Sequence, residues 1–98
     1  MPEQPSVQEF IAQRQADVLR RAITTLETCS DEDLPAEAHR LAGTLGTYQL
    51  DEAQQACRKL EAAAKNPAES GRPLPEVRRT TLETLRAAVG LGKGEALP

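Results

Sequence analysis

The sequence has 98 residues, of which 39% are hydrophobic and 28% are charged, and its formal net charge is −3. A chain of this length can build one core, and its composition excludes both a disordered acidic tail and a membrane protein. No apolar run approaches the ~18 residues that span a bilayer, and the first eight residues lack the basic start and apolar stretch of a secretory signal. We therefore expect one cytoplasmic domain over residues 1–98, without membrane association.

Charge and cysteine content limit the classes of partner and cofactor. Basic residues cluster only in pairs such as Arg78-Arg79, which argues against nucleic acid because that partner requires a concentrated basic face. We expect such pairs on the solvated sides of helices. Cys29 and Cys57 lie far apart in the sequence, and we interpret them as two small buried apolar residues. With one histidine and no close cysteine pair, a zinc site lacks ligands, so no metal and no cofactor are expected.

Four helices are predicted from the spacing of apolar residues and from the positions of proline and glycine. They are expected at about residues 7–29, 34–48, 51–65 and 75–89, with a proline-rich loop before the last helix and a frayed tail over 90–98. Aromatic residues, valine and isoleucine are few, which disfavours strands. Because no helix can bury its apolar stripe alone, the sequence predicts an all-α, antiparallel up-and-down four-helix bundle.

Each predicted helix carries one apolar stripe at helical spacing. The expected core residues of the first two helices are Val7, Phe10, Ile11, Val18, Leu19, Ala22, Ile23 and Leu26, then Leu34, Ala38, Leu41, Leu45 and Tyr48. Those of the last two are Leu50, Ala53, Cys57, Leu60 and Ala64, then Val77, Thr81, Leu82, Leu85, Ala88 and Val89. Ser6 with Glu9, and Asp51 with Gln54, have the spacing of capping boxes at two helix starts.

His39 lies beside the apolar stripe of the second helix rather than on it. At about 100° per residue, Gly43 and Gly46 fall within about 40° of His39 around the helix axis. A glycine inside a helix costs about 0.5–1 kcal/mol relative to alanine, and neither glycine adds to the core stripe. We interpret them as bare backbone that lets a second protein bring a reacting group to within about 3–3.5 Å of the imidazole.

An imidazole in this position is suited to phosphoryl transfer. Its ordinary pKa of about 6.5 leaves most of the ring neutral at cytosolic pH, with a nitrogen lone pair for attack. A phosphoryl group would add a charge of about −1.5 to −2, which Arg40, Arg58 or Lys59 could balance, and the sequence does not decide among them. The ordinary reading also stands: a surface histidine, with glycines that permit close helix packing.

The segment around His39 resembles the signature of histidine-containing phosphotransfer (HPt) domains of bacterial phosphorelays. In that family a helix carries His-x-Leu-Lys-Gly-Ser, often followed by Gly-Thr-Phe-Gly-Leu. The present sequence reads Ala38-His39-Arg40-Leu41-Ala42-Gly43-Thr44-Leu45-Gly46-Thr47-Tyr48-Gln49-Leu50. The resemblance implies a phosphoryl carrier without catalytic activity of its own, and a short single bundle with a polar exterior is expected to be a monomer. His39 would exchange a phosphoryl group with the receiver-domain aspartate of a response regulator or a hybrid sensor histidine kinase.

The resemblance also implies roles for the neighbours of His39. Gly43 would keep the surface open beside the imidazole, while Leu41, Leu45 and Tyr48 would seat the helix in the bundle. Ala42 stands where many family members have a lysine that is thought to hold the phosphoryl group. Gln49 replaces a glycine at the end of the helix, a departure that is expected to matter less. The expected phosphate and partner surface therefore consists of Arg40, Ala42, Gly43, Gly46, Arg58 and Lys59.

Two other functions remain open at this point. A degenerate bundle of the same family could bind a partner without any phosphate chemistry, and Ala42 favours this adaptor. An enzyme could use His39 as a general base. However, the sequence offers no aligned Asp, Ser or Cys partners for it, and a small helical bundle has little room for a substrate pocket.

Overall fold

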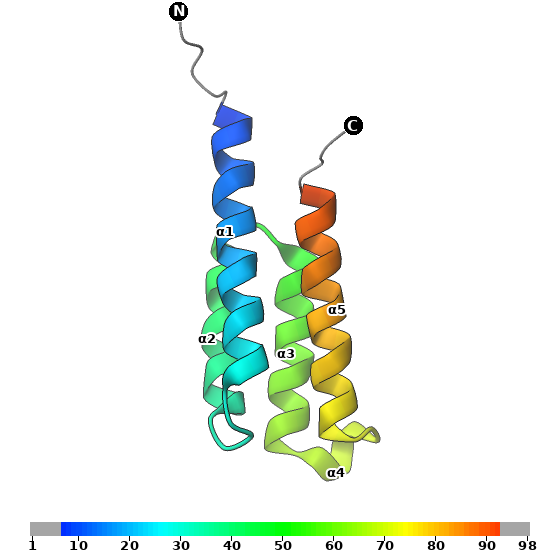
Figure 1. Cartoon of the computed structure of the whole chain (residues 1–98). Coiled ribbons are helices and arrows are strands. Elements are labelled where there is room, and N and C mark those ends of the chain that lie inside the picture. The colour runs from blue at the N-terminus through cyan, green and yellow to red at the C-terminus, as the bar shows by residue number, and fades with distance from the viewer. Residues whose placement is uncertain (1–6, 93–98) are drawn as a thin grey trace, which may run out of the picture.

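The structure is a computed structural model, and it describes residues 7–92. Its helices are α1 (Val7–Thr28), α2 (Leu34–Thr47), α3 (Asp51–Lys65), α4 (Pro67–Ser70) and α5 (Leu74–Gly92). The four long helices run alternately down and up (Figure 1). Helix α2 packs mainly on α3, and α5 packs on both α1 and α3. This arrangement confirms the predicted all-α antiparallel bundle, and residues 7–92 contain no strand.

The last two helices differ from their predicted limits. The proline-rich segment after α3 contains the short helix α4, which ends at Ser70 and is followed by Gly71 with a φ of 73°. Helix α5 does not stop at Val89 but continues through Gly90 to Gly92, because glycine inside a helix is costly and not forbidden. The frayed tail predicted over 90–98 is therefore helical as far as Gly92, and residues 93–98 lie outside the described residues.

The turn between α2 and α3 closes by backbone hydrogen bonds. The N–H of Gln49 donates to the carbonyl of Gly46 and that of Leu50 to the carbonyl of Leu45, both at 3.0 Å, which is the Schellman pattern. Gln49 occupies the left-handed region with a φ of 62°. This conformation strains a residue with a Cβ, so the replacement of glycine matters more here than the sequence suggested.

Neither predicted capping box is present as a described feature. Leu50 is the N-cap of α3, and no side chain bonds to the start of that helix. Asp51 is already helical, so the prediction that it caps the helix together with Gln54 was wrong. Ser6, the first residue of the other predicted box, lies outside the described residues.

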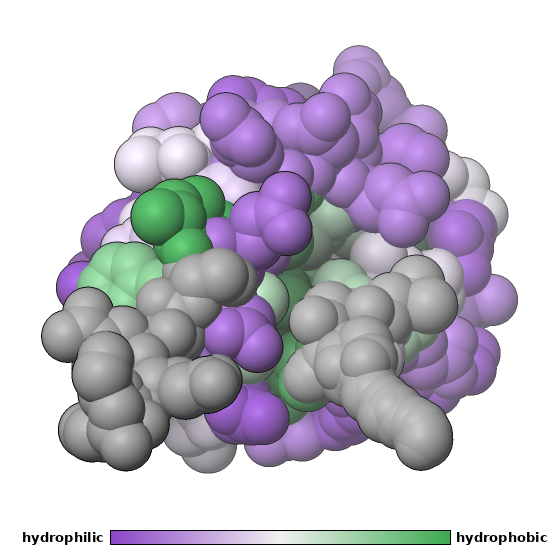
Figure 2. All heavy atoms as spheres, turned by 90° about the horizontal axis from the view of Figure 1, so that it is seen from above, coloured by the Kyte–Doolittle hydropathy of each residue, from purple (hydrophilic) through white to green (hydrophobic). Residues whose placement is uncertain are grey.

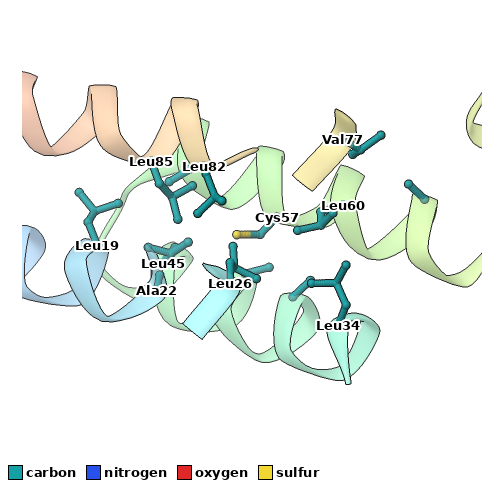
Figure 3. Close-up of a cluster of buried hydrophobic side chains, with 14 residues drawn as sticks. Leu19, Ala22, Leu26, Leu34, Leu45, Cys57, Leu60, Val77, Leu82 and Leu85 are labelled. Atoms are coloured by element: carbon teal, nitrogen blue, oxygen red, sulfur yellow. The ribbon is translucent and has the colours of Figure 1, made fainter. Parts of the chain in front are cut away.

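The core fills the space where the four long helices face one another. Figure 3 shows side chains from α1, α2, α3 and α5 pointing into one interior. The buried apolar residues are Ala16, Leu19, Ala22, Leu26, Leu34, Ala38, Ala42, Leu45, Ala53, Cys57, Leu60, Ala63, Val77, Leu82 and Leu85. Thr81 is buried as well, and its hydroxyl donates to the carbonyl of Val77 at 2.8 Å, so its burial leaves no unsatisfied donor.

The start of α1 departs from the predicted core. Val7, Phe10 and Ile11 are 75%, 54% and 46% exposed, because α1 begins beyond the end of its neighbour α2. The side-chain amide of Gln15 donates to the carbonyl of Tyr48 just after α2 ends, at 2.8 Å, so the turns of α1 before Gln15 extend past that helix. Seen from this end (Figure 2), the described surface is mostly hydrophilic, with hydrophobic side chains confined to small areas.

The buried stripe of α2 is rotated from the predicted one. Ala42 is fully buried, whereas Leu41 and Tyr48, which were predicted in the core, are half-buried. Ala38 and Ala42 lie one turn apart, and small side chains at a helix contact let the backbones approach closely. Position 42 therefore faces the bundle interior.

Arg78 was predicted on a solvated helix side and instead links α5 to the end of α1. Its Nη1 donates to the carbonyls of Leu26 at 2.9 Å and Cys29 at 3.0 Å, and its Nη2 bonds to the Asp31 carboxylate at 2.5 Å. Its side chain is only 17% exposed. A cation at this place satisfies carbonyls that a helix end leaves unpaired and balances the negative end of the helix dipole.

The two cysteines are both free, and their environments differ. Cys57 is fully buried in the core, as predicted, and burial raises the pKa of its thiol to about 11. It therefore stays protonated and behaves as a small apolar side chain. Cys29 is only half-buried, so the prediction of a buried residue was wrong there.

Candidate functional site

His39 lies on α2 with its imidazole outside the core. The side chain is 70% exposed, although its neighbour Ala38 and, one turn on, Ala42 are fully buried. Pro35 in the first turn, with its fixed φ, and the acidic Glu37 favour helix formation here. The buried alanines hold α2 in the bundle, and the exposed ring is thereby attached to a fixed stretch of helix.

Glu61 of α3 holds one nitrogen of this ring. His39 Nδ1 and Glu61 Oε2 are 3.0 Å apart, and Lys65 Nζ donates to the same oxygen at 2.7 Å. The Glu61 side chain is only 12% exposed. The Lys65 bond lowers the pKa of Glu61 from its ordinary value of 4.5, desolvation raises it, and the bond to His39 lowers it further, with a net lowering. Glu61 is therefore a carboxylate at neutral pH.

The charge on Glu61 fixes the proton on the ring. A carboxylate only accepts hydrogen bonds, so Nδ1 must be the donor. In the neutral imidazole this leaves the lone pair on Nε2. No hydrogen bond to Nε2 is formed among residues 7–92. The arrangement therefore presents Nε2 to solvent as a nucleophile. The orientation of the His39 ring is set by the largely buried Glu61 carboxylate.

Sequence reasoning missed Glu61 and Lys65, although two signals pointed to them. The short turn makes α2 and α3 antiparallel neighbours, so residues at similar sequence distances from the turn lie at the same height. His39 and Glu61 are such a pair. Glu61 and Lys65 also have the spacing of a helical ion pair.

The two glycines near His39 have different surroundings. A Cβ on Gly43 would meet nothing within 4 Å, so the surface beside the imidazole is open there. A Cβ on Gly46 would collide with the side chain of Gln54. The expectation that Gly46 offers bare backbone to a partner was therefore wrong, because Gln54 of α3 covers it.

Two residues of α2 that were predicted on the phosphate surface have other surroundings: one is ion-paired and the other is buried. Arg40 is exposed and forms an ion pair with Glu37 at 2.5 Å. Ala42 is fully buried, so its inclusion in the surface was wrong. A long cation at position 42 would point into the core of this bundle, because that position faces the neighbouring helices.

The predicted basic residues of α3 lie on different sides of the helix. Arg58 is exposed and borders a shallow hollow together with Glu61 and Lys65. Lys59 is about 160° from Glu61 around the helix axis and borders the groove between α3 and α5 instead. The prediction that Lys59 belongs to the same surface as His39 was therefore wrong.

Comparison with known proteins gave one finding. The family model described as the Hpt domain matches residues 7–89. Neither the curated proteins nor the solved structures gave a match. Among the described residues, no helix is both long enough and apolar enough to cross a membrane, and no three or more His, Cys, Asp and Glu side chains come together in a way that could hold a metal ion.

Proposed function

Because this chain belongs to the Hpt domain family, whose members carry out histidine phosphotransfer in phosphorelays, we propose that His39 is its phosphoryl-accepting residue. The partner is the receiver domain of a response regulator or of a hybrid sensor kinase, and the exchange takes place in the cytosol. The protein carries the phosphoryl group and has no catalytic activity of its own.

One observation carries this proposal: the Glu61 carboxylate accepts a hydrogen bond from Nδ1–H of the exposed His39 imidazole, at 3.0 Å. Its Nε2 lone pair attacks the phosphorus of the receiver's aspartyl phosphate. The P–O bond breaks, the aspartate leaves as a carboxylate, and a P–N bond forms. Nδ1 keeps its proton, so the ring gains positive charge, which Glu61 stabilises. The reverse sequence of bond changes returns the group to an aspartate.

Access to Nε2 depends on the helix surface beside His39. Gly43 lies one turn away on the same side of α2, and the space over its backbone is empty. A receiver domain must bring its phosphoryl group to about 3–3.5 Å from the attacking nitrogen. The missing side chain at position 43 allows that approach.

Incubation with phosphorylated receiver domains tests the proposal. Wild-type protein should gain a phosphoryl group that is labile in acid and stable in base, and His39→Gln should gain none. The variant should keep its helical circular dichroism and melting temperature, because the ring is 70% exposed. A wild-type protein that binds receivers and never becomes phosphorylated would instead be the adaptor that Ala42 favoured.

A further inference from the structure

We propose that Lys65 of α3 binds the phosphoryl group on His39, in the role that the family pattern gives to a lysine on the histidine's own helix. This inference rests on the proposed function of His39. It names a residue of the site that the sequence signature does not contain, and it assigns that residue to a phosphoryl anion.

The site requires a cation once His39 is phosphorylated. The group adds a charge of about −1.5 to −2, and it does so beside the Glu61 carboxylate, 3.0 Å from the same ring. Helix α2 places no cation beside the ring: position 42 is a buried alanine, and Arg40 lies about 100° from His39 around the helix axis and is paired with Glu37 of its own helix. The compensating charge must therefore come from another helix or from the partner.

Lys65 is the basic residue that the structure ties to His39. Lys65 Nζ and His39 Nδ1 both bond Glu61 Oε2, at 2.7 and 3.0 Å, so their separation cannot exceed the sum of these two distances. The Lys65 side chain is 57% exposed, and its ammonium has three donors on a flexible stem. It can keep its bond to Glu61 and donate to a phosphoryl oxygen on Nε2 of the same ring.

The other cations of α3 are less well placed. Lys59 is on the far side of the helix, and Arg58 forms no hydrogen bond or ion pair with the rest of residues 7–92. Side chains on a helix lean toward its N-terminus. Lys65 therefore leans toward Glu61, whereas Arg58 leans away from it toward the α2–α3 turn. Arg58 is thus a matched control: an exposed cation on the same side of α3 that forms no bond with the ring or with Glu61.

The expected effect of Lys65 is on the titration of the phosphoryl group itself. A nearby cation favours the dianion and so lowers the second pKa of the phosphoryl group. Loss of one partly exposed charge should raise this pKa by about half a pH unit. A role of Lys65 that does not place its charge near the phosphoryl group would not change this pKa.

The experiment loads His39 chemically with phosphoramidate and follows the ³¹P resonance of the folded protein against pH. Lys65→Met should titrate about half a pH unit higher than wild type, Lys65→Arg should titrate like wild type, and so should Arg58→Met. Equal titration of Lys65→Met and wild type, or an equal displacement in Arg58→Met, would overturn the assignment.

Chemical loading separates this inference from the proposed function. It needs no receiver domain, so a failure of receiver transfer would refute the proposed function and leave the titration interpretable. A folded wild-type protein whose His39 takes no phosphoryl group from phosphoramidate would overturn both.

Discussion

Arg78 and Lys65 lie toward the same end of the bundle, and each belongs to a charged cluster that joins two helices. Arg78 is 17% exposed and binds two backbone carbonyls and Asp31. Lys65 is 57% exposed and binds one carboxylate oxygen, which it shares with His39. In the first cluster, the Arg78 guanidinium donates to backbone carbonyls and to Asp31. In the second, the Lys65 ammonium and the Nε2 nitrogen of His39 remain open to solvent.

The difference shows how one small bundle separates stability from chemistry. Arg78 donates to the backbone carbonyls of Leu26 and Cys29. Its removal leaves these carbonyls without that partner, which lowers the stability of the folded state. His39 and Lys65 are exposed, and ion pairs made by exposed side chains contribute little to stability. Substitutions in the two clusters should therefore change different measurements.

The largest expected effect tests whether phosphoryl transfer to His39 requires the open surface over Gly43. Gly43→Leu should slow phosphoryl transfer from a receiver by about 100-fold, because displacement of the reacting groups by about 1 Å is enough for such a loss. Stability should not fall, since the new Cβ meets nothing within 4 Å. The control Gly43→Ala should be more stable than wild type by about 0.5–1 kcal/mol and retain transfer. Normal transfer by Gly43→Leu would contradict the open-surface argument.

The second effect belongs to the Arg78 cluster. Arg78→Met should lower the free energy of unfolding by about 2 kcal/mol, because three charge-assisted bonds are lost, and lower Tm by roughly 10 °C. Arg79→Met removes an exposed partner of Glu83 and should change stability by less than about 0.5 kcal/mol. Denaturant melts measure both. If the two variants melted alike, Arg78 would be an ordinary surface residue.

A smaller effect is expected at the opposite end of the bundle, away from both clusters. Gln49→Gly should raise the free energy of unfolding by about 0.5–1 kcal/mol, because glycine adopts a positive φ without the strain of a Cβ. Phosphoryl transfer should be unchanged. A destabilised variant in a urea melt would show that the turn depends on the glutamine side chain.

The smallest effect is confined to acid pH. The pKa of Glu61 is lower in the folded protein than its ordinary value of 4.5, so ionised Glu61 stabilises the fold above that pH. This contribution is lost as the pH falls through the folded-state pKa. Glu61→Gln should therefore lose less stability than wild type on acidification below pH 4.5. Lys65→Met removes the main cause of the lowered Glu61 pKa, so its loss of stability on acidification should be intermediate. Urea melts at several acid pH values measure this loss, and an equal loss in all three proteins would contradict the prediction.

The sequence predicted the bundle well where burial follows helical periodicity. Leu19, Leu26, Leu60 and Leu85 are buried as predicted, because a stripe at 3.6-residue spacing has one favourable orientation in a bundle. The same rule failed for Phe10, since periodicity within one helix does not say where its neighbours end. An apolar stripe that extends past its partners stays in solvent.

The candidate site was predicted only in part, for a related reason. His39 and Gly43 share one face of one helix, and their proximity follows from helical spacing alone. Glu61 and Lys65 come from the neighbouring helix, so their proximity to His39 depends on the antiparallel register between α2 and α3. The burial of Ala42 likewise depends on how α2 is rotated about its axis against its neighbours. The spacing of apolar residues within α2 does not determine this rotation to within one residue.

The first turns of α1 project beyond α2, with Val7 75% exposed and Phe10 54% exposed. Amides without tertiary cover open most easily and exchange their hydrogens fastest. Unzipping of the bundle should therefore begin there, about 20 Å along the helix axes from the level of His39. The His39 ring is thus attached far from the end of the molecule where opening is expected to begin, so local opening there leaves the contact between His39 and Glu61 in place.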